Sequence, residues 1–149
     1  MEILLKCPPY TNSNEESWVQ VAEFIEEYPD TESWLDYKRF LRPVICTAKS
    51  EGLDHLFRAG GSMSDTTLST ADRPLEAYTP QPPRITIRAQ GKQKSVAWSH
   101  SNLWFSEPER MEIVTSDNVL PILKSFLADL WRETRPFEAL PVGLRSENR

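Results

Sequence analysis

Among the residues of this sequence, a histidine close to aromatic side chains is the best candidate for a catalytic or ligand-binding group. His100 follows Trp98 by two positions, so a regular strand would place both side chains on the same face. Trp104 comes soon after them. A histidine in an aromatic cleft can act as a general base or bind a ligand. The simpler interpretation, which its position near a turn favours, is a histidine at the end of a strand without a chemical role.

A second histidine lies in a polar stretch earlier in the chain. His55 precedes Arg58 closely, but nothing in the spacing pairs it with a nucleophile. The loop 71–83 carries several prolines, and a pocket between this loop and the sheet is one place where the two histidines could meet. In that hypothesis the ligand-binding residues are His55, Arg58, His100 and Trp104.

The sequence lacks the motifs that identify common enzymes and metal proteins. Gly61-Ser62-Met63-Ser64 is without the second glycine of a serine-hydrolase turn, and neither the dinucleotide-binding nor the P-loop glycine pattern occurs. The two cysteines, Cys7 and Cys46, have no metal-binding spacing and make no disulfide framework. We therefore predict no catalytic residues, no metal ligands and no cofactor.

The same features favour a soluble cytoplasmic protein. The N-terminal apolar run 3–5 is too short for a signal peptide, and no later stretch approaches the length of a membrane span. Two cysteines without a framework fit a reducing compartment, although one bridge between them is the alternative.

Charge is distributed unevenly along the 149 residues, whose net charge is −5. The segment 13–36 contains no lysine or arginine, whereas the segment 84–110 is mildly basic. The net acidity argues against nucleic-acid binding. An acidic helical face is in most cases simply hydrated, and the alternative is a docking face for a basic protein. The residues of that predicted docking face are Glu16, Glu23, Glu27 and Asp30.

Two helices are expected in the first third of the chain. The stretch 13–16 has the spacing of a capping box, apolar residues then recur with helical periodicity, and Pro29 ends this helix. Asp30 or Thr31 can cap a second helix, which should run to Gly52. Since proline fits poorly in a helix interior, we expect a kink or a fresh start near Pro43.

Strands and a final helix follow. The run 55–59 is expected as a strand entering a turn at Gly60-Gly61, with a returning strand over 66–71. Alternation over 84–89 and 96–98, then a short run at 111–114, predicts further strands. The last helix has a broad apolar stripe, typical of a helix packed on a sheet. That stripe consists of Val119, Ile122, Leu123, Phe126, Leu127, Leu130 and Trp131.

Together these elements predict an α+β fold. It has an antiparallel sheet of four to five strands, two N-terminal helices and one C-terminal amphipathic helix, with the helices mainly on one face. We expect a single domain over residues 1–137 and a mobile tail over 138–149.

The predicted function is a non-catalytic interaction or inhibitor protein of immunity type from a bacterial cell. Its acidic helical face would bind a basic protein partner. One alternative is a small-ligand-binding protein or enzyme with a pocket near His100 and Arg58. Another is a homo-oligomeric accessory protein, for example a homodimer, whose exposed strand pairs with itself.

Overall fold

The computed structural model describes residues 13–62, 65–100 and 108–145. Trp104, one of the predicted ligand-binding residues, lies outside them. In chain order the elements are α2 (Asn14–Glu26), α3 (Glu32–Ser50), α4 (Leu53–Leu56), β1 (Arg58–Ser62), β2 (Asp65–Ser69), the 3-10 helix η2 (Leu75–Ala77), β3 (Arg84–Arg88), β4 (Lys94–Ser99), β5 (Arg110–Val114), α5 (Val119–Thr134) and the 3-10 helix η3 (Val142–Leu144).

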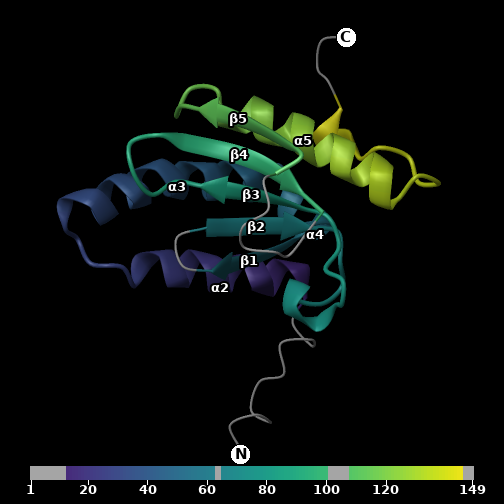
Figure 1. The fold of residues 1–149 in the computed structure, drawn as a ribbon, viewed down its shortest axis with the longest axis horizontal. Coiled ribbons are helices and arrows are strands. Elements are labelled where there is room, and N and C mark those ends of the chain that lie inside the picture. Colours follow the sequence, from purple (N-terminus) through teal and green to yellow (C-terminus); the bar gives the residue numbers. More distant parts are fainter. Residues whose placement is uncertain (1–12, 63–64, 101–107, 146–149) are drawn as a thin grey trace, which may run out of the picture.

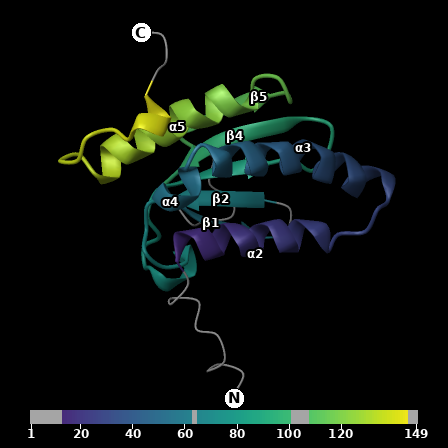
Figure 2. The same cartoon turned by 180° about the vertical axis from the view of Figure 1, so that it is seen from behind.

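The five strands form one antiparallel sheet in which spatial order follows chain order, β1 to β5. Helices α3 and α5 cover one face of this sheet, and α2 lies beyond β1 at the edge (Figures 1 and 2). The predicted α+β fold with two N-terminal helices and one C-terminal helix is confirmed. No helix in the described ranges is long and apolar enough to cross a membrane.

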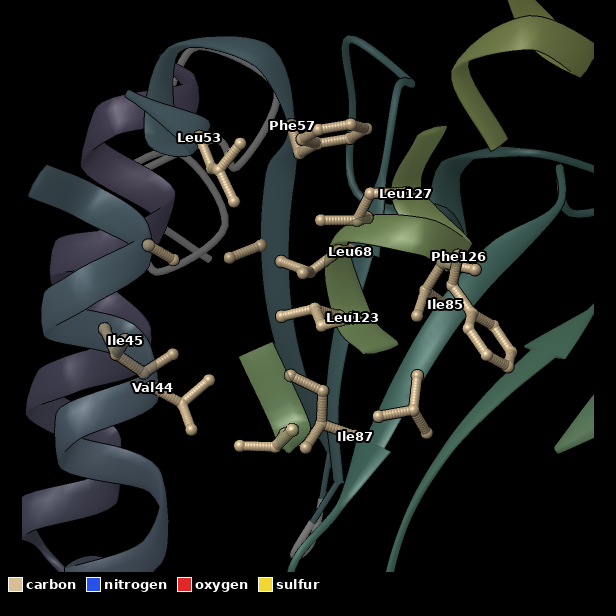
Figure 3. Close-up of a cluster of buried hydrophobic side chains, with 14 of the residues drawn as sticks. Val44, Ile45, Leu53, Phe57, Leu68, Ile85, Ile87, Leu123, Phe126 and Leu127 are labelled. Atoms are coloured by element: carbon tan, nitrogen blue, oxygen red, sulfur yellow. The ribbon is translucent and has the colours of Figure 1, made fainter. Parts of the chain in front are cut away.

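The core lies between the sheet and the two covering helices. Alternation along β3 turns Ile85 and Ile87 toward the helices, and the antiparallel register places them opposite Trp98 and Val96 of β4. These side chains meet the apolar stripe of α5 and one side of α3 (Figure 3). Trp98 is 7% exposed, so this tryptophan belongs to the core.

Helix α2 closes the β1 edge of the sheet through two side-chain hydrogen bonds. The Ser17 hydroxyl accepts the backbone N–H of Ala59 at 2.9 Å, and the Trp18 indole N–H donates to the carbonyl of Phe57 at 2.9 Å. Both α2 side chains are buried. The predicted capping box is present at Ser13 and Glu16 and fixes where the helix begins. An edge that would otherwise expose unpaired backbone groups is thereby covered.

Helix α3 runs through Pro43 as a single helix, which excludes a fresh start there. Proline removes the hydrogen bond to the carbonyl of Arg39, and both residues lie on the solvent side of the helix, where water can take that bond. Cys46 is exposed on the same side. The opposite side supplies Val44 and Ile45 to the core.

The start of the sheet differs from the prediction. Residues 53–56 form the short helix α4, and β1 begins at Arg58, so the predicted strand over 55–59 is wrong in its first half. Gly60 and Gly61 lie inside β1 instead of forming a turn. Gly60 allows a close approach, because a Cβ there would lie 3.0 Å from the Thr67 hydroxyl, whereas a Cβ on Gly61 would make an ordinary contact, 3.5 Å from the Phe24 ring of α2.

Part of the segment beyond residue 137 contacts the core. Leu144, in η3, is 5% exposed and belongs to the buried cluster. The division of the chain at residue 137 stays a prediction.

Replacement of Ser17 by alanine tests the closure of the β1 edge. The change removes the acceptor of the buried Ala59 N–H, so we expect the free energy of unfolding to fall by about 1–3 kcal/mol. Urea denaturation followed by circular dichroism measures it.

Ser125→Ala is the matched control, because this serine is exposed on α5 and should change stability by less than about 0.5 kcal/mol. Equal effects of the two changes would contradict the role given to Ser17.

Candidate functional site

The outward side of α2 combines acidic and apolar side chains. Glu16, Glu23 and Glu27 are all exposed, and helical spacing places them along one side of the helix. Between them stand Val19, 45% exposed, and Phe24, 39% exposed. We call these five residues the α2 acidic face. Val19 and Phe24 are the two large apolar side chains that α2 exposes.

Other carboxylates of this region are already engaged within the molecule. Glu26 accepts two hydrogen bonds at 2.6 Å from Arg42, and Asp30 accepts one at 2.9 Å from the buried Lys38. Hydrogen bonding by Arg42 lowers the pKa of Glu26, and hydrogen bonding by Lys38 lowers the pKa of Asp30. Asp30, one of the four predicted partner-binding residues, is therefore part of the contact between α2 and α3.

Glu23 and Glu27 differ from these carboxylates. Among the described residues no lysine, arginine or histidine forms an ion pair with either of them. Glu16 accepts the backbone N–H of Ser13 at 3.2 Å and has no cationic partner in the same ranges. Within the described ranges, the carboxylates of the α2 acidic face are thus exposed and have no cationic partner.

His100 is held between two carboxylates at the end of β4. Its Nε2 lies 2.7 Å from Glu133 of α5, its Nδ1 lies 3.3 Å from Glu109, and its backbone N–H donates to Glu109 at 3.1 Å. The indole N–H of Trp98 donates to the same Nδ1 at 3.3 Å. Neutral imidazole can accept from Trp98 while it donates to Glu133; protonated imidazole donates to both carboxylates instead.

The environment of His100 favours its charged form. Hydrogen bonding to Glu133 is the largest cause that raises the pKa of His100, with Glu109 adding in the same direction and burial opposing it. No serine, cysteine or threonine side chain is bonded to this imidazole in the described ranges. The cluster can hold a proton, and it joins the end of β4 to the residue before β5 and to α5.

The predicted ligand-binding residues have separate partners. His55 bonds to Glu15 of α2, whereas Arg58 donates to the backbone carbonyl of Asp72 at 2.9 Å. The carboxylate of Glu15 has a lowered pKa, first through a backbone hydrogen bond and then through His55. Neither contact involves His100, whose partners were described above.

An open depression of about 960 Å³ lies at the other end of β4 from His100. The first turns of α3, the β3–β4 turn and the end of β5 line it. Its cations Arg39, Lys92 and Lys94 are balanced in part by Glu32 and Asp36, and Lys94 already pairs with Asp36. The lining residues include no histidine and no cysteine.

Metal binding has no arranged donor set in the part of the chain that the structure describes. There, no group of three or more histidine, cysteine, aspartate and glutamate side chains is placed to hold an ion.

Comparison with known proteins gives no match. No protein-family model, no curated protein and no solved structure matches this chain.

Val19 and Phe24 are the residues of the α2 acidic face that sequence reasoning missed. Val19 lies away from the buried side of α2, and this displacement was the available signal, whereas Phe24 lies at the margin of that side and also contacts Gly61 of β1. No sequence pattern indicated that Glu133 is a partner of His100, because Glu133 lies on α5, 33 residues further along the chain.

The protonation of His100 is the second prediction. We expect its pKa, followed by NMR titration of the ring protons, to lie above the ordinary 6.5 and to fall in the Glu133→Gln variant. Since the folded-state pKa is raised, the contribution to stability is fully present below pH 6.5 and is lost as pH rises through the folded-state pKa. Because the imidazole is 44% exposed, this contribution should stay below about 1 kcal/mol.

Asp72→Asn, which changes an exposed carboxylate outside this cluster, serves as the control and should leave the titration of His100 unchanged. A His100 pKa at or below 6.5 in the wild type would contradict the contacts described here.

Proposed function

We propose that this protein is a non-catalytic interaction protein of inhibitor or immunity type, which binds a basic protein partner through the α2 acidic face. The observation that carries the proposal is that Glu23 and Glu27, which no described cation pairs with, lie beside the exposed side chains of Val19 and Phe24. Charge would attract and orient the partner, and the apolar side chains would supply contact area.

The length of the charged surface suits a folded basic partner. Glu16 and Glu27 are eleven positions apart, which corresponds to about 16 Å along a helix axis. Glu23 lies between them on the same side. Such a row can face several lysine or arginine side chains of a partner, and its spacing is fixed because a helix holds it.

Phe24, in the apolar part of the α2 acidic face, packs against neighbouring residues of the protein. The Phe24 ring packs edge-on against Tyr28, with centroids 5.5 Å apart, and lies over Gly61 of β1. A partner would therefore meet an aromatic side chain whose rotamer is already restricted. Apolar contacts surrounded by charged ones follow the usual arrangement of protein interfaces.

Helix α2, which carries these side chains, is held in place by contacts at both of its ends and with β1. The capping box fixes the first turn of α2, and Ser17 and Trp18 bind the helix to β1. Ion pairs to Lys38 and Arg42 fix the end near α3. Binding to this surface would cost little ordering entropy, which supports a docking role over that of a hydrated helix.

Charge reversal on α2 is the third prediction. The double variant Glu23→Lys/Glu27→Lys leaves the capping box and the Asp30–Lys38 pair intact, so it should fold as the wild type does. With wild-type protein as bait at low salt, we expect capture of a basic protein, and at least about tenfold less of it with the double variant. Quantitative mass spectrometry of the bound fraction measures both.

Asp72→Lys/Asp117→Lys is the matched control, since it makes the same change in net charge at exposed positions outside α2. Capture by this control should equal that of the wild type and should decline as salt is added. The proposal is wrong if the α2 variant captures as much as the control does, or if the captured protein is acidic.

Truncation of an apolar residue on the same face is the fourth prediction. Val19→Ser should weaken binding of the captured partner about fivefold, because roughly 1 kcal/mol of apolar burial is lost. Val142→Ser is the control, because Val142 is 75% exposed and lies outside α2. Titration by isothermal calorimetry gives both affinities, and equal affinities would leave Val19 without a role in binding.

A further inference from the structure

The two edges of the sheet are treated differently by the fold. At β1 the side chains of α2 take up backbone groups of the edge, as described for Ser17 and Trp18. At β5 no described element lies beyond the strand (Figure 1). A free strand edge presents a row of backbone donors and acceptors to any strand that can align with it.

The direction of the free backbone groups follows from one hydrogen bond. The carbonyl of Trp98 accepts the N–H of Glu109 at 2.9 Å, so the backbone of Trp98, and of every second residue along β4, points toward β5. The next such residue, Val96, is paired with Glu112. The intervening residues Met111 and Ile113 therefore direct their N–H and C=O groups away from the sheet.

The side chains of this edge are exposed as well. Met111 is 49% exposed and Ile113 is 46% exposed, and alternation places both on the face that α3 and α5 do not cover. Glu112, also exposed, and Arg110 project from the other face. The edge is thus apolar on one side and carries one charge of each sign on the other.

We propose that β5 pairs antiparallel with β5 of a second copy of this chain, around a two-fold axis at Met111. In this register Met111 faces Met111 of the other copy, and Arg110 faces Glu112 of the other copy twice. The strand is complementary to itself, as a symmetric interface requires. The two sheets become one continuous sheet.

The charges select this register over its nearest rival. A shift of one position along each strand puts the axis at Glu112, so that two like charges face each other directly, which is unfavourable. Arg110 is already oriented for the favoured register: its guanidinium lies 4.0 Å from the centre of the Phe126 ring and bonds to Asp129. It remains partly exposed, which leaves room for a second carboxylate.

The short, charged strand also explains why pairing should stop at two copies. A five-residue edge with a glutamate at its centre is poorly suited to indiscriminate strand addition. Each copy has its other edge closed by α2. A pair joined at β5 therefore has no open strand edge in its described part, and it carries one α2 acidic face at each outer end.

Sedimentation velocity over a range of protein concentrations tests this proposal. The wild type should form a dimer, and Glu112→Arg should be a monomer because two arginines then face each other. Met111→Lys should also be a monomer. Asp72→Arg and Phe137→Lys are the matched controls, at exposed positions away from β5, and should dimerise as the wild type does.

A disulfide cross-link tests the register in a Cys7→Ser/Cys46→Ser background. Opposed residues of a hydrogen-bonded antiparallel pair have Cα atoms about 5.5 Å apart, within the range that a disulfide spans. Met111→Cys should therefore cross-link under mild oxidation, whereas Ile113→Cys should not. A wild type that stays monomeric, a Glu112→Arg variant that still dimerises, or equal cross-linking at the two positions would each overturn the proposal.

Discussion

The contact between α2 and the edge strand β1 is the interaction on which the rest of the structure depends. The hydroxyl of Ser17 and the indole of Trp18 satisfy backbone groups that would otherwise be unpaired at the edge of the sheet. With both side chains buried, the helix has one fixed orientation. Its charged residues, which cannot be buried without partners, are thereby placed on the outside.

This orientation divides the acidic residues of the segment into two groups. Those near the neighbouring helices become ion pairs that hold the architecture together, as Glu26 does with Arg42 and Asp30 with Lys38. Glu23 and Glu27 form no ion pair with a described cation. One helix thus serves as structural cover on one side and as a charged surface on the other, and the function proposed here uses only the second side.

Local signals explain which parts of the fold and site were predictable. The capping box at Ser13, the alternation of β3 and the apolar stripe of α5 depend on neighbours in sequence, and each was predicted correctly. The glycines of β1 were misassigned to a turn, because the close approach of Thr67 to Gly60 comes from strand pairing, which sequence spacing does not show. Among the site residues, Glu16, Glu23 and Glu27 are exposed on α2 as expected, whereas the pairing of Asp30 with Lys38 depends on how α2 and α3 pack.

Amide hydrogen exchange at Ala59, measured by NMR, tests the central contact most directly. If Ser17 of α2 holds this edge amide, Ala59 should exchange as slowly as Ile87, which lies in the central strand β3 and is fully buried. Met111, whose amide is on the open edge, gives the fast reference in dilute protein. Exchange of Ala59 at the rate of Met111 would contradict the account, because α2 would then not close the sheet or present a fixed surface.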